Sequence, residues 1–296
     1  MRMAYRVVIA AWSGVAMLCG QDLAGVVDLH AHSHPDSVAR SIDAVDLARL
    51  AASRGMRGLL LKNHYMPTAQ LAYVARKAVP GIELFGGIVL NRAVGGINLA
   101  AVENMAKVEG GLGRVVWMPT FDAENQVRTN GEKRPYVSVS RDGKLLPEVM
   151  EVLRAIGRNK LVLATGHSTP AEVLMLVEEA RKAGVERILV THAMLAPVKM
   201  SIPEMKRAAA LGGKIEFVYN ALIGAQKMYD VADYVKAIRA IGPEHCYLSS
   251  DLGQAGNPLH PDGFLAYLKA LAAAGIPVRS SWVNNSPIRN AFRHRS

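Results

Sequence analysis

Short apolar runs alternate along the chain with longer segments that have helical spacing. Runs such as residues 58–64 and 161–167 are apolar until their last few positions, which is typical of strands buried on both faces. In residues 41–54, apolar side chains instead recur at helical spacing, and Thr169 with Glu172 has the capping-box pattern of a helix start. The predicted strands are residues 26–32, 58–64, 85–91, 115–120, 161–167, 187–192, 214–220 and 246–251, and the predicted helices are residues 41–54, 68–78, 98–108, 147–158, 169–184, 201–211, 230–240 and 261–274.

Eight strands that alternate with eight helices close most simply into a (β/α)8 TIM barrel, a fold of the α/β class. The chain of 296 residues is long enough for one such barrel, which we predict as a single domain over residues 21–296. Residues 121–146 interrupt the alternation with a long polar segment, in which Asp142 and Gly143 predict the turn of a small hairpin. A loop of this length is usually functional or disordered.

Polar residues that could act in catalysis or metal binding follow the apolar part of nearly every predicted strand. Six of the nine histidines lie at or just past a strand end, namely His30, His32, His34, His64, His167 and His192. The other polar residues at strand ends are Lys62, Asn91, Thr120, Asn220 and Asp251. Because catalytic residues of such barrels lie at the carboxyl ends of the strands, we expect these side chains to converge on one mouth.

Two of these histidines, His30 and His32, are two positions apart on one strand, so their side chains share a face, which Asp28 joins one step deeper. Nitrogen and oxygen ligands in this combination suit one or two divalent metal ions, zinc above all, with manganese and iron as alternatives. A bound divalent ion lowers the pKa of its water to about 7, and Asp251 can take the proton and pass it to a leaving group. The predicted metal ligands are His30, His32, His167, His192 and Asp251.

The first residues of the chain have the layout of a secretory signal peptide. Arg2 and Arg6 precede an apolar run over residues 7–18, which is too short to span a bilayer comfortably. We therefore expect residues 1–20 to be removed and the protein to be exported to the periplasm or beyond, with a cytoplasmic protein that begins with an apolar strand or helix as the alternative. Removal would leave Cys246 as the one cysteine, so we expect no intramolecular disulfide.

The composition predicts a compact globular protein, since half of the residues are hydrophobic and 20% are charged. Loss of residues 1–20 would lower the net charge from +10 to +8. The lysines and arginines are scattered, and none of their runs forms a basic arm, so we interpret the charge as a solvated surface. We expect a small-molecule substrate as partner, with no nucleic acid and no stable membrane insertion.

The order of the candidate ligands resembles that of the amidohydrolase superfamily over nearly all of residues 25–296. That superfamily has His-x-His after strand one, Lys or Glu after strand four, His after strands five and six, and Asp after strand eight; the matching positions here are His30, His32, His167, His192 and Asp251. Residues 285–291 also resemble a helix start common near the end of these chains. The resemblance implies a metal-dependent hydrolase of an amide, lactone or ester, with the first pair and Asp251 on one metal and the other two histidines on a second metal or on the substrate.

The sequence departs from this pattern at strand four, which ends in Met118-Pro119-Thr120 and offers no bridging lysine or glutamate. We therefore expect a branch of the superfamily in which Lys62 and His64 are the nearest catalytic substitutes. A carboxylated Lys62 would bridge two metals, whereas an ammonium would attract a substrate anion, and a lysine that reaches solvent would do neither. His64 is a candidate ligand or general acid, while Glu216 shares the parity of the strand-seven mouth residues but lies a layer deeper.

Residues 25–95 also resemble the polymerase-and-histidinol-phosphatase family of metal-dependent phosphoesterases. Asp28 through Ser33 and the later Lys62-Asn63-His64 carry this likeness, but the usual Asp-His is Asn63-His64 here. A phosphoesterase therefore stays as an alternative function. A non-catalytic binding barrel that retains a structural metal is an alternative from another class.

Candidate substrate-binding residues come from strand ends and from the long polar segment. They are Lys62, Asn91, Asn220, Arg128 and Arg134. A segment that follows strand four should lie over the mouth, where its positive charge would favour a carboxylate or phosphate on the substrate. The alternative is a flexible, solvent-exposed loop that does not contact a ligand.

Overall fold

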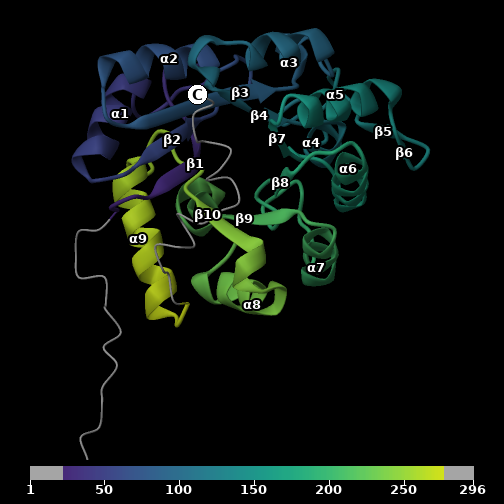
Figure 1. The fold of residues 1–296 in the computed structure, drawn as a ribbon. Coiled ribbons are helices and arrows are strands. Elements are labelled where there is room, and N and C mark those ends of the chain that lie inside the picture. The colour runs from purple at the N-terminus through teal and green to yellow at the C-terminus, as the bar shows by residue number, and fades with distance from the viewer. Residues whose placement is uncertain (1–22, 277–296) are drawn as a thin grey trace, which may run out of the picture.

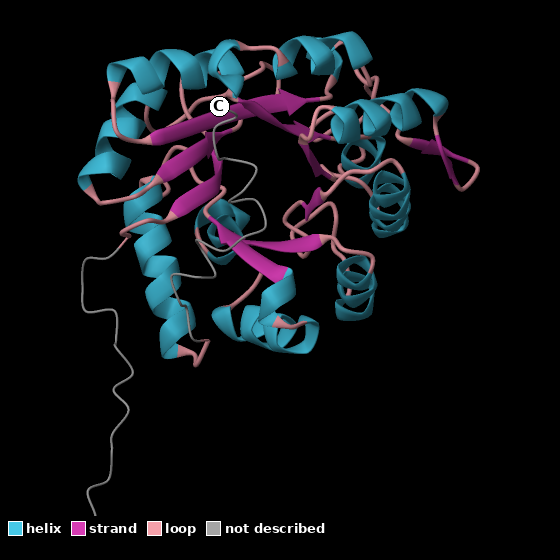
Figure 2. Ribbon diagram, in the orientation of Figure 1, coloured by secondary structure: helices cyan, strands magenta, loops and turns pink. Residues whose placement is uncertain are grey.

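A computed structural model describes residues 23–276 of the chain. Eight parallel strands form one sheet in the order β1-β2-β3-β4-β7-β8-β9-β10. Figures 1 and 2 show that this sheet curves round into a nearly closed barrel with the helices on its outside. The predicted (β/α)8 barrel is thus confirmed. Each strand of the sheet except β1 follows a helix that packs on the outside of the barrel, as the alternation of the sequence predicted.

The barrel strands are β1 (Val27–Ala31), β2 (Gly58–Leu61), β3 (Glu83–Val89), β4 (Gly113–Trp117), β7 (Val162–Ala164), β8 (Arg187–Val190), β9 (Lys214–Val218) and β10 (Cys246–Ser249). The helices are α1 (Ala44–Ser53), α2 (Ala69–Ala78), α3 (Leu99–Ala106), α4 (Glu124–Thr129), α5 (Pro147–Arg158), α6 (Pro170–Lys182), α7 (Ile202–Ala210), α8 (Val231–Ile241) and α9 (His260–Ala273). Each strand ends one to three residues earlier than predicted, because pairing stops before most of the polar end residues. Apart from His30, which lies on β1, these residues consequently lie in the first turns after the strands, at the mouth.

The helix starts follow from local capping. The side chain of Asp43 accepts hydrogen bonds from Val45 N and Asp46 N at the start of α1. Thr169 and Glu172 form the predicted capping box of α6. Such caps satisfy backbone N–H groups that have no partner within the helix, so they help to fix where α1 and α6 begin.

The long polar segment after β4 is ordered and contains more structure than predicted. The strands β5 (Ser140–Arg141) and β6 (Lys144–Leu145) pair antiparallel across the turn at Asp142 and Gly143, both of which have positive φ, so the predicted hairpin is confirmed. The helix α4 was not predicted, since Val127 is its one buried residue and its sequence has no apolar periodicity. Figure 1 shows the hairpin at the outer edge of the barrel, beyond α5 and α6.

The barrel closes between its first and last strands through the segment that carries the candidate ligands. Ala31 and Leu252 form an isolated parallel bridge. His32 N donates a hydrogen bond to Leu252 O, and Asp251 N donates one to His30 O, each at 2.9 Å. Gly253 follows with φ of 121°, and a Cβ there would lie 2.3 Å from His32 O, so only glycine fits this seam.

Within residues 23–276 no helix is both long and apolar enough to cross a membrane. The predicted signal peptide over residues 1–20 and the motif at residues 285–291 lie outside the described residues.

Candidate metal centre

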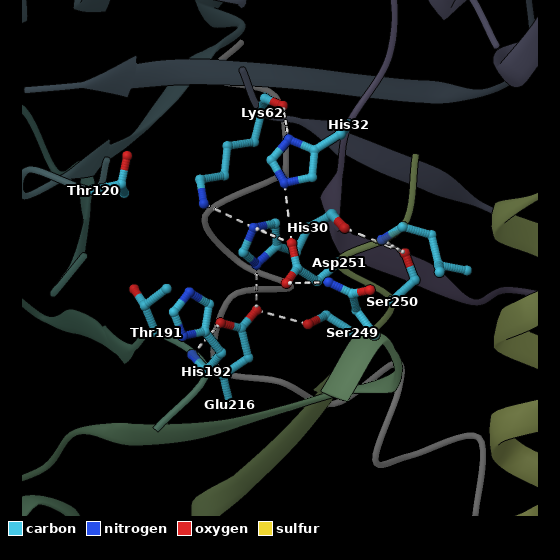
Figure 3. A network of polar contacts seen from close by, with 12 residues as sticks. His30, His32, Lys62, Thr120, Thr191, His192, Glu216, Ser249, Ser250 and Asp251 are labelled. Atoms are coloured by element: carbon cyan, nitrogen blue, oxygen red, sulfur yellow. Dashed lines mark hydrogen bonds and ion pairs between the residues drawn. The ribbon is translucent and has the colours of Figure 1, made fainter. Parts of the chain in front are cut away.

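Three predicted ligands converge at the carboxyl end of the seam. His30 lies on β1, His32 follows it, and Asp251 follows β10. The Oδ1 atom of Asp251 is 3.0 Å from Nε2 of His30 and 3.0 Å from Nε2 of His32. All three side chains are buried, and their ligand atoms lie within 4.8 Å of one another (Figure 3). This spacing fits one metal ion.

The far nitrogen of each ring is held by an acceptor. Nδ1 of His30 lies 3.0 Å from Oε1 of Glu216, and Nδ1 of His32 lies 2.7 Å from the carbonyl oxygen of Lys62. If each Nδ1 donates its hydrogen outward, each Nε2 presents a lone pair toward the Asp251 carboxylate. Three acceptors that face one another in a buried site can be satisfied by a divalent cation. The hydrogen bonds at the two Nδ1 atoms would fix the orientation of the ligand rings. The donor set therefore fits a metal.

Glu216, on β9, orients this site from the layer beneath it. Its carboxylate accepts hydrogen bonds from Ser249 Oγ at 2.6 Å and from the backbone N of His192 at 2.7 Å, besides its contact with His30. Burial alone would raise the pKa of Glu216, but His30 and the other partners hold it below its usual value. Sequence reasoning ranked Glu216 low because it lies too deep to reach a metal. The missed signal is an inward-facing acid on a buried strand, one layer below histidine ligands.

A second pair of predicted ligands faces the first. His167 and His192 follow β7 and β8, and their Nε2 atoms lie 3.1 Å apart. Burial lowers the pKa of His192 to about 4 and lowers the pKa of His167 well below 6.5. Both rings are therefore uncharged at neutral pH, as metal ligation requires.

The backbone is unusual at two ligand positions. His192 has φ of 22° and Asp251 has φ of 51°, in the region where residues with a Cβ are uncommon. Such strain is held by surrounding structure and clusters at functional sites. At Asp251 the seam hydrogen bond from its N to His30 O supplies that restraint.

Lys62 and His64 project into the same mouth. Lys62 is 1% exposed, so its amine does not reach solvent, and its Nζ lies 2.8 Å from Nε2 of His30 and 5.7 Å from the centre of the Trp117 ring. Burial lowers the pKa of Lys62 to about 8. His64 stacks on Phe121 with ring centres 3.7 Å apart. The structure thus brings both catalytic candidates next to the candidate metal centre.

A cavity of about 300 Å³ opens onto this centre. Lys62, His64, His167, His192 and Asp251 form its floor, and this size suits a small-molecule ligand. Its upper walls come from loops after several strands, through Phe121, Gln126, Leu195, Ala196, Ala225, Gln226, Lys227, Met228 and Gln254.

The two asparagines predicted to bind substrate lie in the wall behind this cavity rather than on it. Asn91 is fully buried, and its amide nitrogen donates to His64 O and Thr120 Oγ1. Asn220 donates to Asp251 Oδ2 at 3.4 Å and accepts from Asn257. Their amides hold catalytic candidates in place.

The two arginines of the long segment also lie away from the cavity lining. The guanidinium of Arg128 is 64% exposed, pairs with Glu124 and packs over the Tyr136 ring. Arg134 pairs with Asp122 and Glu132 and donates to the carbonyl oxygen of Phe121 at 2.6 Å. Both charges are therefore engaged within the segment itself.

Asp28 does not join the ligand cluster. Its Oδ1 accepts hydrogen bonds from Ser250 N at 2.9 Å and His30 N at 3.2 Å. Burial raises the pKa of Asp28 to about 6. Its contacts join β1 to the turn after β10, beneath the metal centre.

Solved structures of hydrolases share this fold. A single-residue mutant of organophosphorus hydrolase from Deinococcus radiodurans matches with a TM-score of 0.60 and 16% identity, over 92% of this chain and 94% of that chain. An amidohydrolase from Pseudomonas aeruginosa matches with a TM-score of 0.56 and 12% identity, over 92% and 96%. A structure from the engineering of organophosphate hydrolysis activity from a weak promiscuous lactonase template matches with a TM-score of 0.60 and 16% identity, over 92% and 96%. The amidohydrolase resemblance is thus borne out in the fold.

No curated protein matches the sequence. A family model matches residues 25–216, which span β1 to the middle of β9 and include all the candidate ligands except Asp251. The chain belongs to the family of unknown function DUF6282.

Proposed function

We propose that the protein is a metal-dependent hydrolase that acts on an amide, lactone or ester of a small molecule. The observation that carries this proposal is the convergence of His30, His32 and Asp251 within 4.8 Å of one another, next to a cavity of about 300 Å³ that Asp251 lines. A divalent ion held by these residues, zinc above all, would supply an activated water nucleophile and would polarise the bond to be cleaved. The folds shared with an organophosphorus hydrolase and an amidohydrolase agree with this chemistry.

Asp251 is the proposed general base and, after attack, the general acid. Burial alone would raise its pKa, but His30 and His32 hold the pKa of Asp251 well below its usual range, so it is ionised at neutral pH. Its carboxylate lines the cavity, and Asn220 donates to its outer oxygen. These features support a carboxylate that takes a proton from the nucleophile and returns it to the leaving group.

Lys62 is the proposed bridge to a second ion held by His167 and His192. Its amine lies 2.8 Å from Nε2 of His30, the nitrogen that would ligate the first ion, so an ammonium there would repel that ion. A carbamate, formed by attack of the uncharged amine on carbon dioxide with loss of a proton, would carry negative charge toward both ions instead. The alternative is an ammonium that binds a substrate anion.

Metal content and turnover test this function together. The purified protein should hold one to two equivalents of a divalent metal and should hydrolyse at least one member of a panel of esters, lactones, amides and phosphoesters. His30→Ala with His32→Ala should lose the metal, whereas the exposed His245→Ala should retain it. Asp251→Asn should lower turnover about 10²- to 10⁴-fold. A chain without metal in all preparations would refute the proposal.

The same panel separates the alternatives. Turnover confined to phosphoesters would favour the phosphoesterase, for which the organophosphorus hydrolase fold is the supporting observation. Tight binding of a small molecule without turnover, equal in wild type and Asp251→Asn, would favour the binding barrel. For Lys62, the apolar variant Lys62→Met should lower metal content by one equivalent if the carbamate bridges. If Lys62 is an ammonium, the same variant should instead raise KM for anionic substrates alone.

We also propose that the protein is exported after removal of residues 1–20, on the sequence pattern alone. Mass spectrometry of the protein from its native host decides this, because an intact Met1 on the major species contradicts it.

A further inference from the structure

The orientation of one buried amide, that of Asn91, is fixed by four hydrogen bonds. Its Oδ1 accepts from Thr120 N at 2.8 Å and from Asp122 N at 3.2 Å. Its Nδ2 donates to His64 O and to Thr120 Oγ1, each at 2.9 Å. A flipped amide would place its NH₂ against two N–H donors and its oxygen against a carbonyl oxygen. Backbone groups alone therefore decide which end of the Asn91 amide donates.

This orientation decides where the hydroxyl hydrogen of Thr120 points. Thr120 is fully buried, and its Oγ1 already accepts from Asn91. The other close partner of Oγ1 is Nδ1 of His64, at 2.9 Å. Were Nδ1 to donate, Oγ1 would accept twice, and its own hydrogen would have no acceptor among the described residues. A buried donor without an acceptor costs about 1–3 kcal/mol. Thr120 Oγ1 therefore donates to His64 Nδ1.

A ring nitrogen that accepts a hydrogen bond carries no hydrogen, so the hydrogen of the uncharged His64 ring is on Nε2. The ring is clamped between Phe121, at 3.7 Å between ring centres and 12° between planes, and His32, at 5.0 Å and 21°. His64 lines the cavity, and among residues 23–276 no hydrogen-bond partner of its Nε2 is found. The Nε2–H is thus an unused donor in a rigid ring at the metal centre.

We propose that His64 is a neutral hydrogen-bond donor to the substrate oxygen that gains negative charge during hydrolysis, and that Thr120 and Asn91 are positioning residues that set its tautomer. This inference rests on the proposed function and deepens it. The ligand atom is a carbonyl or phosphoryl oxygen bound beside the metal. Two earlier readings of His64 are thereby excluded: an Nε2 that carries a hydrogen does not ligate a metal, and a neutral imidazole is no general acid. Removing one such donor costs about 10²- to 10³-fold in turnover.

The test is the tautomer itself, read by ¹⁵N NMR of the zinc-loaded full-length protein labelled in histidine, with His64 assigned through His64→Gln. We expect Nδ1 of His64 in the shift range of an unprotonated ring nitrogen and Nε2 in that of a protonated one. The readout needs no substrate, so a protein that hydrolyses nothing refutes the function but leaves the tautomer measurable. A hydrogen on Nδ1, or on both nitrogens, at neutral pH would overturn the inference.

Two variants of Thr120 separate tautomer control from simple packing. Thr120→Val keeps the shape of the side chain but removes the hydroxyl, so the Nδ1 resonance of His64 should move. Thr120→Ser keeps the hydroxyl and should restore the wild-type pair of shifts. The zinc content of all three proteins should be equal, because His64 is not a ligand. Loss of zinc in His64→Gln, or wild-type His64 shifts in Thr120→Val, would overturn the assignment.

Discussion

The Nε2 atoms of His167 and His192 lie 3.1 Å apart, although the two rings come from different strands. Nδ1 of His167 faces Oε1 of Gln126 at 2.7 Å, which assigns its hydrogen to Nδ1 and leaves its Nε2 bare. Nδ1 of His192 has no partner among the described residues, so in the metal-free chain the hydrogen of His192 belongs between the two Nε2 atoms. A second metal bound at these Nε2 atoms would require the hydrogen of His192 to move to its Nδ1.

The first prediction concerns this second pair. His192→Ala should lower the bound metal by one equivalent and leave the ion at His30, His32 and Asp251 in place. Elemental analysis after equilibration with zinc measures this, with His245→Ala as the control. An unchanged stoichiometry would make the pair a substrate contact instead.

The second prediction concerns the carboxylate beneath the site. Glu216→Gln should weaken metal binding about 10- to 100-fold, because the partner of a ligating histidine tunes and orients that ligand. The NH₂ group of the new amide would also face a group that now donates to Glu216, either His192 N or Ser249 Oγ. Competition with a chromogenic chelator measures the affinity. The exposed Glu244→Gln is the matched control, and equal affinities in the two variants would reduce Glu216 to a packing residue.

The third prediction compares the two arginines of the long segment. Arg134 donates to the backbone of Phe121, which stacks on His64, whereas Arg128 pairs with Glu124 of its own segment. Arg134→Ala should therefore raise KM for neutral and anionic substrates alike, and Arg128→Ala should change KM little. The charge-based prediction from the sequence differs, because it expects both variants to raise KM for anionic substrates alone. Steady-state kinetics on a matched neutral and anionic pair of esters decides between them.

The fourth prediction concerns pH. Burial lowers the pKa of His192 and of His260 to about 4, against 6.5 in an exposed chain, and lowers the pKa of His32, His64 and His167 as well. Between pH 4 and 6.5 the unfolded chain thus binds protons that the folded chain does not, so folding stability rises with pH across this window and is lost as pH falls. Each unit of pKa difference is worth about 1.4 kcal/mol.

Asp28 acts in the opposite sense, because its raised pKa of about 6 favours the folded state at low pH and that gain is lost as pH rises from 3.8 to 6. The five buried histidines outnumber it, so the urea midpoint of the metal-free protein should fall from pH 7 to pH 5. His245→Ala should show the same fall, since that ring is partly exposed. A midpoint that is constant over this range would show that the folded chain binds protons as readily as the unfolded chain does.

Much of the fold follows from features that are local in sequence. Buried parallel strands are apolar throughout, and a capping box lies within four residues, so the elements and their alternation were predictable. The mouth was predictable as well, because barrel geometry carries every strand end to one face and the histidines mark those ends. The hairpin at Asp142 and Gly143 was predictable because both turn positions need positive φ.

The partners of the site residues depend on distances between strands, which sequence spacing does not contain. Glu216 reaches the far side of His30 because β9 neighbours β10, and only the closed sheet brings β10 to β1. Asn91 looked like a substrate ligand because it ends a strand, but the backbone N–H groups after β4 use its amide. The sequence prediction treated the charges of Arg128 and Arg134 as available to a substrate. The structure pairs both with acidic residues of the same polar segment, and sequence spacing does not show which charges of a loop pair with one another.

A metal bound at the seam between the first and last strands would affect the stability of the barrel as well as its chemistry. His32 and Asp251 are 219 positions apart in sequence, yet they would hold the same ion. Such an ion would be a cross-link that closes most of the chain into a ring. In the chain-entropy model, a cross-link that closes a loop of even 100 residues stabilises the folded state by about 4.7 kcal/mol. The same bond would hold the barrel shut whether or not any chemistry takes place. Loss of turnover after chelation therefore does not by itself show that the ion is catalytic. Only a variant that keeps its metal and its fold but not its turnover, as we expect of His64→Gln, separates the structural role of the ion from its catalytic role.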